Sequence, residues 1–191
     1  MATRAEDLIR RHRYTVGDYQ RMGEAGILGA DDRVELIEGE IVDMAPIGSA
    51  HAGTVDYLVA AFLRAVGDRA IVRSQNPVVL GSRSAPQPDV LLVRPRSDFY
   101  RLAHPVAADV LLAVEVADAT LRYDRETKIP LYARHGVPEA WLVDIEASAL
   151  HVFREPSAEG YLHETRVTDL AAVTVERLPG VTLDLRSLFG A

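Results

Sequence analysis

Two carboxylates occupy positions in apolar segments of the sequence, where charged residues are rare. Asp89 opens the apolar run 90–93, and Glu115 lies inside a second run, 110–117. Both runs have the length of buried β-strands, which read as continuous hydrophobic segments when both faces are covered. Desolvating a carboxylate there costs several kcal/mol unless a cation, a proton or hydrogen bonds compensate. A divalent metal ion and Lys128 are two such partners, so we expect a metal site at the two carboxylates with the lysine beside it.

Strand alternation sharpens the argument for Glu115. Alternate residues face alternate sides, which places Glu115 with Leu111, Ala113 and Ala117 and leaves the other face to the even-numbered aliphatic residues of the run. The two alanines predict room for an ion and a substrate. A carboxylate at a sheet edge, or one paired with an internal arginine, would explain the same pattern without a site.

The other two residues also have simpler interpretations. Asp89 follows a proline, and an aspartate there often only caps a turn. Lys128 lies four positions after Asp124, a spacing that is typical of a surface ion pair worth well under 1 kcal/mol. A functional role for Lys128 requires that its helix pack back over the strand of Glu115.

Composition narrows the class of protein. The chain has 191 residues, 48% of them apolar and 26% charged, which suits one soluble domain. A net charge of -7 argues against broad, non-specific nucleic-acid binding but not against a nuclease whose metal supplies positive charge. The absence of cysteine excludes disulfides, thiolate catalysis and cysteine-based zinc sites. Without a signal-peptide pattern or a membrane-length apolar run, we expect a cytoplasmic protein with no membrane contact.

The order of predicted elements indicates a mixed α/β sheet flanked by helices in one domain, 14–191, after a frayed extension, 1–13. The sequence predicts a capped helix from Thr15, a hairpin turning at Glu38-Gly39, a long helix that Ser49 caps, and a helix over 121–135 that Pro130 kinks or splits. Strands are expected over 71–74, 78–80 and 139–145, a hairpin over 150–154 and 161–167, and a helix or turn at 185–189.

Six motifs, taken in order, resemble the Uma2 family of bacterial restriction-endonuclease-like proteins, which is similar to the PD-(D/E)XK nuclease superfamily. The resemblance covers residues 14 to 189. The motifs that carry it are Glu35-Leu-Ile-Glu-Gly-Glu-Ile-Val, Ser74-Gln-Asn-Pro, Pro86-Gln-Pro-Asp89, Val114-Glu115-Val-Ala, Tyr123-Asp-Arg-Glu-Thr-Lys128 and Gly136-Val-Pro-Glu-Ala-Trp-Leu-Val-Asp144. The fold that it implies is restriction-endonuclease-like.

The resemblance also implies roles for individual residues. Asp89 matches the aspartate of the nuclease motif, and Glu115 matches its second acidic position. The lysine expected two residues later is absent, because that position is Ala117, and Lys128 matches a displaced lysine. Glu35 is the best match for a further acidic position, although a solvent-exposed carboxylate in the hairpin would give the same sequence pattern.

Two more positions are candidates. His51, near the start of the long helix, matches a family position and could carry a proton or bind phosphate, or be structural. Gln87 could position phosphate or water, or be an ordinary loop amide.

The implied reaction is metal-assisted phosphodiester hydrolysis on DNA by a homodimer. Mg²⁺, or Mn²⁺, would be held by Asp89, Glu115 and the backbone carbonyl of Val116, with Lys128 orienting the attacking water. The alternative is a catalytically inactive module on the same fold that binds nucleic acid or a protein. The negative net charge and the missing lysine at Ala117 favour that alternative.

Overall fold

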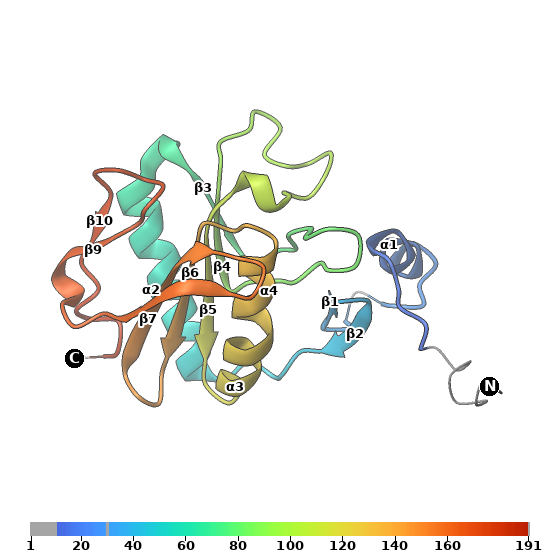
Figure 1. Ribbon diagram of the computed structural model, residues 1–191, viewed down its shortest axis with the longest axis horizontal. Helices are drawn as coiled ribbons and strands as arrows, with labels where there is room; N and C mark the ends of the chain where they lie inside the picture. The colour runs from blue at the N-terminus through green and yellow to red at the C-terminus, as the bar shows by residue number, and fades with distance from the viewer. Residues whose placement is uncertain (1–10, 30, 191) are drawn as a thin grey trace, which may run out of the picture.

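A six-stranded mixed sheet organises the protein. The computed structural model describes residues 11–29 and 31–190, and Figure 1 shows the sheet with helices on its two sides. Only β5 and β6 run parallel, and the other neighbours are antiparallel. The strands, in spatial order, are β3 (Ile71–Ser74), β4 (Val90–Val93), β5 (Val110–Ala117), β6 (Glu139–Asp144), β7 (Ala149–Pro156) and β8 (Tyr161–Arg166).

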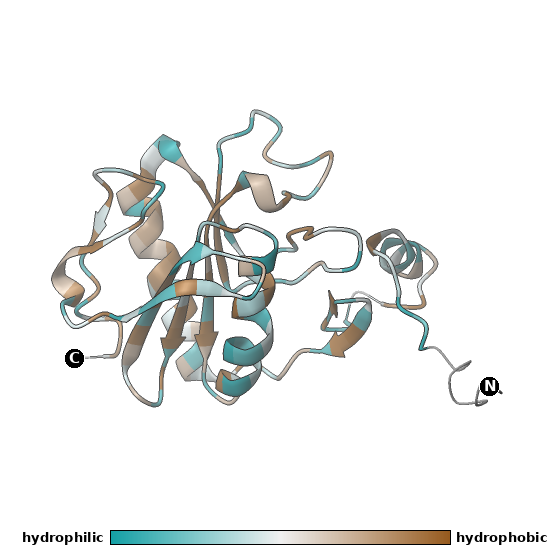
Figure 2. Ribbon diagram, in the orientation of Figure 1, coloured by the Kyte–Doolittle hydropathy of each residue, from teal (hydrophilic) through white to brown (hydrophobic). Residues whose placement is uncertain are grey.

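Helices bury the two faces of this sheet. On one face, α2 (Ser49–Val66) packs Leu58 and Phe62 into a core that includes Trp141. The crossover between the parallel strands covers the other face with α4 (Ile129–Arg134). All residues of β4, β5 and β6 are buried, and Figure 2 shows these central strands as the hydrophobic interior. The continuous apolar runs thus mark strands that are covered on both sides.

A β-bulge changes the expected parity of β5. Beyond the bulge, Ala113 and Ala117 lie in one core and the intervening even-numbered residues lie in the other, as alternation predicts. Before it, Val110 and Leu111 lie on the opposite faces from those expected, because the register with β4 shifts between Leu92 and Val93. An extra residue in one strand reverses the facing of every residue on its far side.

The crossover helix is interrupted where a proline was expected to disturb it. It runs as α3 (Leu121–Tyr123), a π-helical turn over Asp124–Lys128, and then α4. The Ile129 N–H donates to the carbonyl of Asp124, five residues back. Pro130 has no N–H to donate and stands at the start of α4, which explains the break in the α-helical pattern. This turn sets where Asp124 and Lys128 point.

A separate hairpin lies beside the sheet. It comprises β1 (Val34–Ile37) and β2 (Glu40–Asp43), and its turn residues Glu38 and Gly39 have φ of 49° and 83°, as the sequence predicted. The preceding helix, α1 (Val16–Glu24), begins with the expected capping box, in which Thr15 and Asp18 bond reciprocally. Hydrogen bonds tie this unit to residues 82–87, and so the hairpin faces the sheet in a fixed position.

Some local expectations were incomplete. Residues 78–80 form only isolated bridges, and the short strands β9 (Val173–Thr174) and β10 (Thr182–Leu183) were not anticipated. The N-terminal cap of α2 is Gly48, without a side-chain hydrogen bond, in place of Ser49. The predicted frayed extension lies, for its first ten residues, outside the described part of the chain. Among the described helices, none has the length and apolar character to cross a bilayer.

Candidate metal and nuclease site

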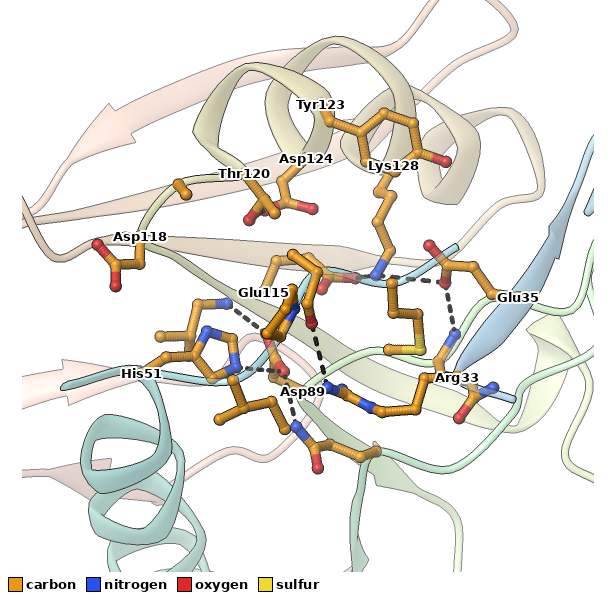
Figure 3. Close-up of a pocket in the computed structure, with 18 of the residues that line it drawn as sticks. Arg33, Glu35, His51, Asp89, Glu115, Asp118, Thr120, Tyr123, Asp124 and Lys128 are labelled. Carbon is orange, nitrogen blue, oxygen red and sulfur yellow. Dashed lines mark hydrogen bonds and ion pairs between the residues drawn. The ribbon is translucent and has the colours of Figure 1, made fainter. Parts of the chain in front are cut away.

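One pocket brings together side chains from five elements that are far apart in the sequence (Figure 3). Its volume of about 110 Å³ is room for a few waters or a hydrated ion. It lies where the hairpin, the start of α2 and the crossover helix meet the ends of β4 and β5. The residues on which the argument rests are Glu35, His51, Asp89, Glu115, Val116, Asp124 and Lys128.

Asp89 is fixed by three donors. Its Oδ1 lies 2.9 Å from His51 Nε2 and 3.4 Å from Gln75 Nε2, and its Oδ2 accepts from the Val116 N–H at 2.8 Å. Strand β5 extends beyond its pairing with β4, so the Val116 N–H is free to bind the side chain that precedes β4. The Asp89 side chain thus continues the hydrogen bonding between β4 and β5 at this end of the sheet, and it also lines the pocket.

Glu115 and Lys128 form a buried ion pair. Lys128 Nζ lies 2.8 Å from Glu115 Oε1 and 3.5 Å from Glu35 Oε2. The side chains of these three residues are at most 6% exposed. The hydroxyl of Tyr132, one turn further along the helix, donates to the same Glu115 oxygen. The crossover helix therefore does pack over β5, and Lys128 is not half of a surface pair with Asp124.

Glu35 enters the pocket from the hairpin. Its Oε2 accepts from the Gln87 backbone N–H at 3.0 Å, and the Gln87 side-chain amide donates to the Val34 carbonyl at 2.9 Å. The carboxylate is buried and does not stand in solvent. Gln87 therefore holds the hairpin strand in place, and its amide nitrogen points at backbone and not into the pocket.

The buried charges shift one another's pKa values. Burial raises the pKa of Glu115 well above its ordinary value, and the lysine only partly opposes this. Burial also raises the pKa of Asp124, again against the effect of Lys128. For Lys128, burial favours the neutral form, but Glu115 and then Glu35 outweigh it and raise the pKa, so the ammonium stays charged.

Asp89 behaves differently from the other acids. Burial acts to raise its pKa, but the hydrogen bond and the charge of His51, followed by the Val116 N–H, leave the pKa of Asp89 below its ordinary value. The hydrogen bond to Asp89 is in turn the main reason that the pKa of His51 is raised. The Asp89 carboxylate is thus held in its ionised form, which is the form that binds cations.

Comparison with known proteins identifies the family. A family model named Uma2 and described as "Putative restriction endonuclease" matches residues 16–186. The chain belongs to the Uma2 family. A solved structure described as a "putative nuclease belonging to DUF820" from Anabaena variabilis ATCC 29413 has the same fold, with a TM-score of 0.73. It is 17% identical in sequence over 92% of this chain and 97% of that one. No functionally curated protein matches.

The Uma2 motifs come from distant parts of the sequence, and the fold brings their charged residues into one pocket. Asp89, Glu115 and Lys128 line it together, with Glu35 on the far side of the lysine. His51 lines it through its contact with Asp89. The confirmed fold is the restriction-endonuclease-like mixed sheet that the motifs predicted.

Two residues of the site were not singled out from the sequence. Tyr132 binds Glu115, and Asp124, whose Oδ2 accepts from Thr120 at 2.6 Å, lies buried in the same pocket. Asp124 was interpreted only as a surface partner of Lys128. The burial of Asp124 and the contact of Tyr132 with Glu115 both depend on how the helix packs against the sheet. The spacing of residues within the helix does not reveal that packing.

The donor set fits a hard divalent cation. Four buried carboxylates line the pocket against one buried lysine, so negative charge is in excess. Within residues 11–190, position 30 aside, no three His, Asp or Glu side chains are arranged to hold an ion by themselves. Mg²⁺ does not need such a cluster, because it keeps several waters and binds through one or two carboxylates. A catalytic Zn²⁺ usually takes three protein ligands and fits less well.

Proposed function

We propose that this Uma2 protein is a divalent-metal-dependent DNA endonuclease that hydrolyses phosphodiester bonds with Asp89, Glu115 and Lys128. The observation that carries the proposal is the position of Lys128. It comes from a helix, yet its ammonium lies 2.8 Å from the Glu115 carboxylate, in the pocket that Asp89 also lines. Lys128 follows Ala117 by eleven positions, and its proximity to one of the two motif acids supports a role as the displaced lysine.

Asp89 and Glu115 would hold the ion, with the Val116 carbonyl as a third ligand. In a strand, the N–H and C=O of one residue point to the same neighbour. The Val116 N–H faces Asp89, so its carbonyl is expected on that side as well. When bound there, Mg²⁺ or Mn²⁺ would activate a water and neutralise phosphate charge.

Lys128 would orient the attacking water or stabilise the charge that develops on the phosphate. Burial opposes the charged form, but Glu115 and then Glu35 raise the pKa of Lys128, so it would act as a cation, through its position and charge. Glu35, whose Oε2 lies 3.5 Å from Nζ on its other side, would help to hold the ammonium in place. His51 would keep Asp89 ionised and oriented.

DNA is the proposed substrate because the family description is that of restriction endonucleases. Cleavage of both strands would follow from a homodimer, in which a two-fold axis relates two sites as it relates the two strands.

A plasmid nicking assay in Mg²⁺ or Mn²⁺ tests the proposal. Wild type is expected to nick supercoiled DNA, while Asp89→Ala and Lys128→Met lower the rate at least about 100-fold. Asp184→Asn is the matched control, because it removes an exposed carboxylate that does not line the pocket. Equal nicking by wild type and Asp89→Ala would assign the activity to a contaminant. An inactive wild type would favour the non-catalytic binding module.

A further inference from the structure

The carboxylate of Glu115 is held unevenly. Lys128 and the Tyr132 hydroxyl both reach Oε1. Within the described residues, no hydrogen bond reaches Oε2, although Glu115 lines the pocket. One oxygen is therefore committed to the protein, and the other is free to bind something that enters the pocket.

Tyr132 has a rigid setting for this contact. Its side chain is fully buried and belongs to the same core cluster as Ala113 and Ala117, the two small residues on either side of Glu115 along their face of β5. The tyrosine ring thus belongs to the cluster in which these alanines leave space beside Glu115. Tyr132 follows Lys128 by four residues, so one face of the helix aims both donors at one oxygen.

A tyrosine suits this position for a chemical reason. Its hydroxyl is a donor that carries no charge, so it binds one carboxylate oxygen without competing with a cation. A second lysine there would offset the charge that attracts an ion. A phenylalanine would fill the same space but leave Oε1 with the lysine alone.

We propose that Tyr132 is a positioning residue, which fixes Glu115 Oε1 so that Oε2 is the atom offered to a divalent ion shared with Asp89. This inference rests on the proposed function, because it assigns a ligand atom in the same metal site. Tyr132 itself touches neither ion nor substrate. It restricts the rotation of a carboxylate that would otherwise be free to turn both oxygens toward Lys128.

Metal affinity, measured without DNA, is the first test. Titration calorimetry with Mn²⁺ compares wild type, Tyr132→Phe and the control Tyr57→Phe, whose hydroxyl bonds the Asp184 carbonyl away from the pocket. Tyr132→Phe is expected to raise the dissociation constant of Mn²⁺ about tenfold or more, the usual effect of losing a group that orients a metal ligand. Tyr57→Phe should leave it unchanged. If Tyr132 is purely structural, Tyr132→Phe will lower the melting temperature but leave the Mn²⁺ affinity unchanged. That result would overturn the inference.

Crystals of the wild type soaked in Mn²⁺ give a second test that does not depend on a variant's folding. The expected result is an ion on Glu115 Oε2, located by its anomalous signal, with the Tyr132 contact to Oε1 retained. An ion on Oε1, with Tyr132 displaced, would overturn the role of Tyr132 while supporting a metal-dependent nuclease. If Asp89→Ala does not reduce the Mn²⁺ uptake of the wild type, both the role of Tyr132 and the metal-dependent nuclease are overturned. If Mn²⁺ binding depends on Asp89 but the protein does not nick DNA, only the proposal of phosphodiester hydrolysis is overturned.

Discussion

The buried acids of the pocket are not all balanced by the same partner, although they line one small volume. Asp89 is balanced by His51 and a backbone N–H, and its pKa is lowered. Glu115 and Asp124 depend mainly on Lys128, which they share with Glu35, and their pKa values are raised. The site therefore holds one carboxylate that is readily ionised and others that are costly to ionise without a further cation. This is the electrostatic basis for expecting a divalent ion.

Asp124 gives a pH-dependent prediction. A carboxyl whose pKa is higher in the folded state binds its proton more tightly there, so the stability that it contributes is present at low pH and is lost as pH rises above about 3.9. Asp124→Asn removes this loss and keeps an acceptor for Thr120. Relative to wild type, the free energy of unfolding of Asp124→Asn is expected to increase from pH 4 to pH 7, by on the order of 1 kcal/mol.

Urea denaturation of the metal-free protein at several pH values measures this difference in unfolding free energy. Asp118→Asn, which removes an exposed carboxylate from the rim of the same pocket, controls for the loss of one negative charge. A gain that is equal at pH 4 and pH 7 would show that burial of the Asp124 charge is not the cause.

At the scale of elements, the sequence predicts most of what positions the site. Continuous apolar runs locate β4 and β5, and Glu38-Gly39 locates the hairpin turn. The residues that such patterns miss depend on events between elements. The β-bulge that exchanges Val110 and Leu111 arises from pairing with β4, and no property of the run itself signals it.

The π-helical turn is a second example. Pro130 predicts an interruption of the helix, but which residues then face the strand depends on the form of that interruption. The burial of Asp124 and the contact of Tyr132 with Glu115 follow from it. The apolar runs around Asp89 and Glu115, together with motifs that resemble a family, predicted that these acids and Lys128 share one site, and the three side chains do line one pocket.

The hairpin turn supplies a prediction about an element. A Cβ at Gly39 would lie 2.8 Å from the Cβ of Arg13 and 3.0 Å from the Tyr14 carbonyl, and its φ is positive. Gly39→Ala is expected to destabilise the protein by about 1–3 kcal/mol and to loosen the strand that carries Glu35. Gly23→Ala, in α1, is the matched control: its Cβ meets nothing within 4 Å, and it should stabilise by up to about 1 kcal/mol.

Thermal denaturation measures both glycine variants. Equal melting temperatures for Gly39→Ala and wild type would mean that the turn relaxes without cost, and the hairpin would then not be a rigid support for Glu35.

At the scale of the whole molecule, charge opposes the proposed substrate. The chain carries a net charge of -7, and six acidic side chains line the pocket against Arg33 and Lys128. A DNA phosphate that approaches this pocket meets repulsion unless cations enter with it. A bound divalent ion can be the largest local charge in such a site and can reverse the sign of the interaction. Substrate binding and ion binding are therefore expected to be coupled.

Fluorescence anisotropy of a labelled duplex tests this coupling. Ca²⁺ is the suitable ion for this measurement, because it takes the same oxygen ligands as Mg²⁺ with less exacting geometry. Wild type should bind DNA at least about tenfold more tightly in Ca²⁺ than in EDTA at matched ionic strength, a difference of about 1.4 kcal/mol. Asp89→Ala should lose that increase, whereas Asp184→Asn, which removes an exposed charge elsewhere, should keep it. Tight binding in EDTA that Ca²⁺ leaves unchanged would mean that DNA is held by another surface, and that the acidic pocket does not receive the phosphate.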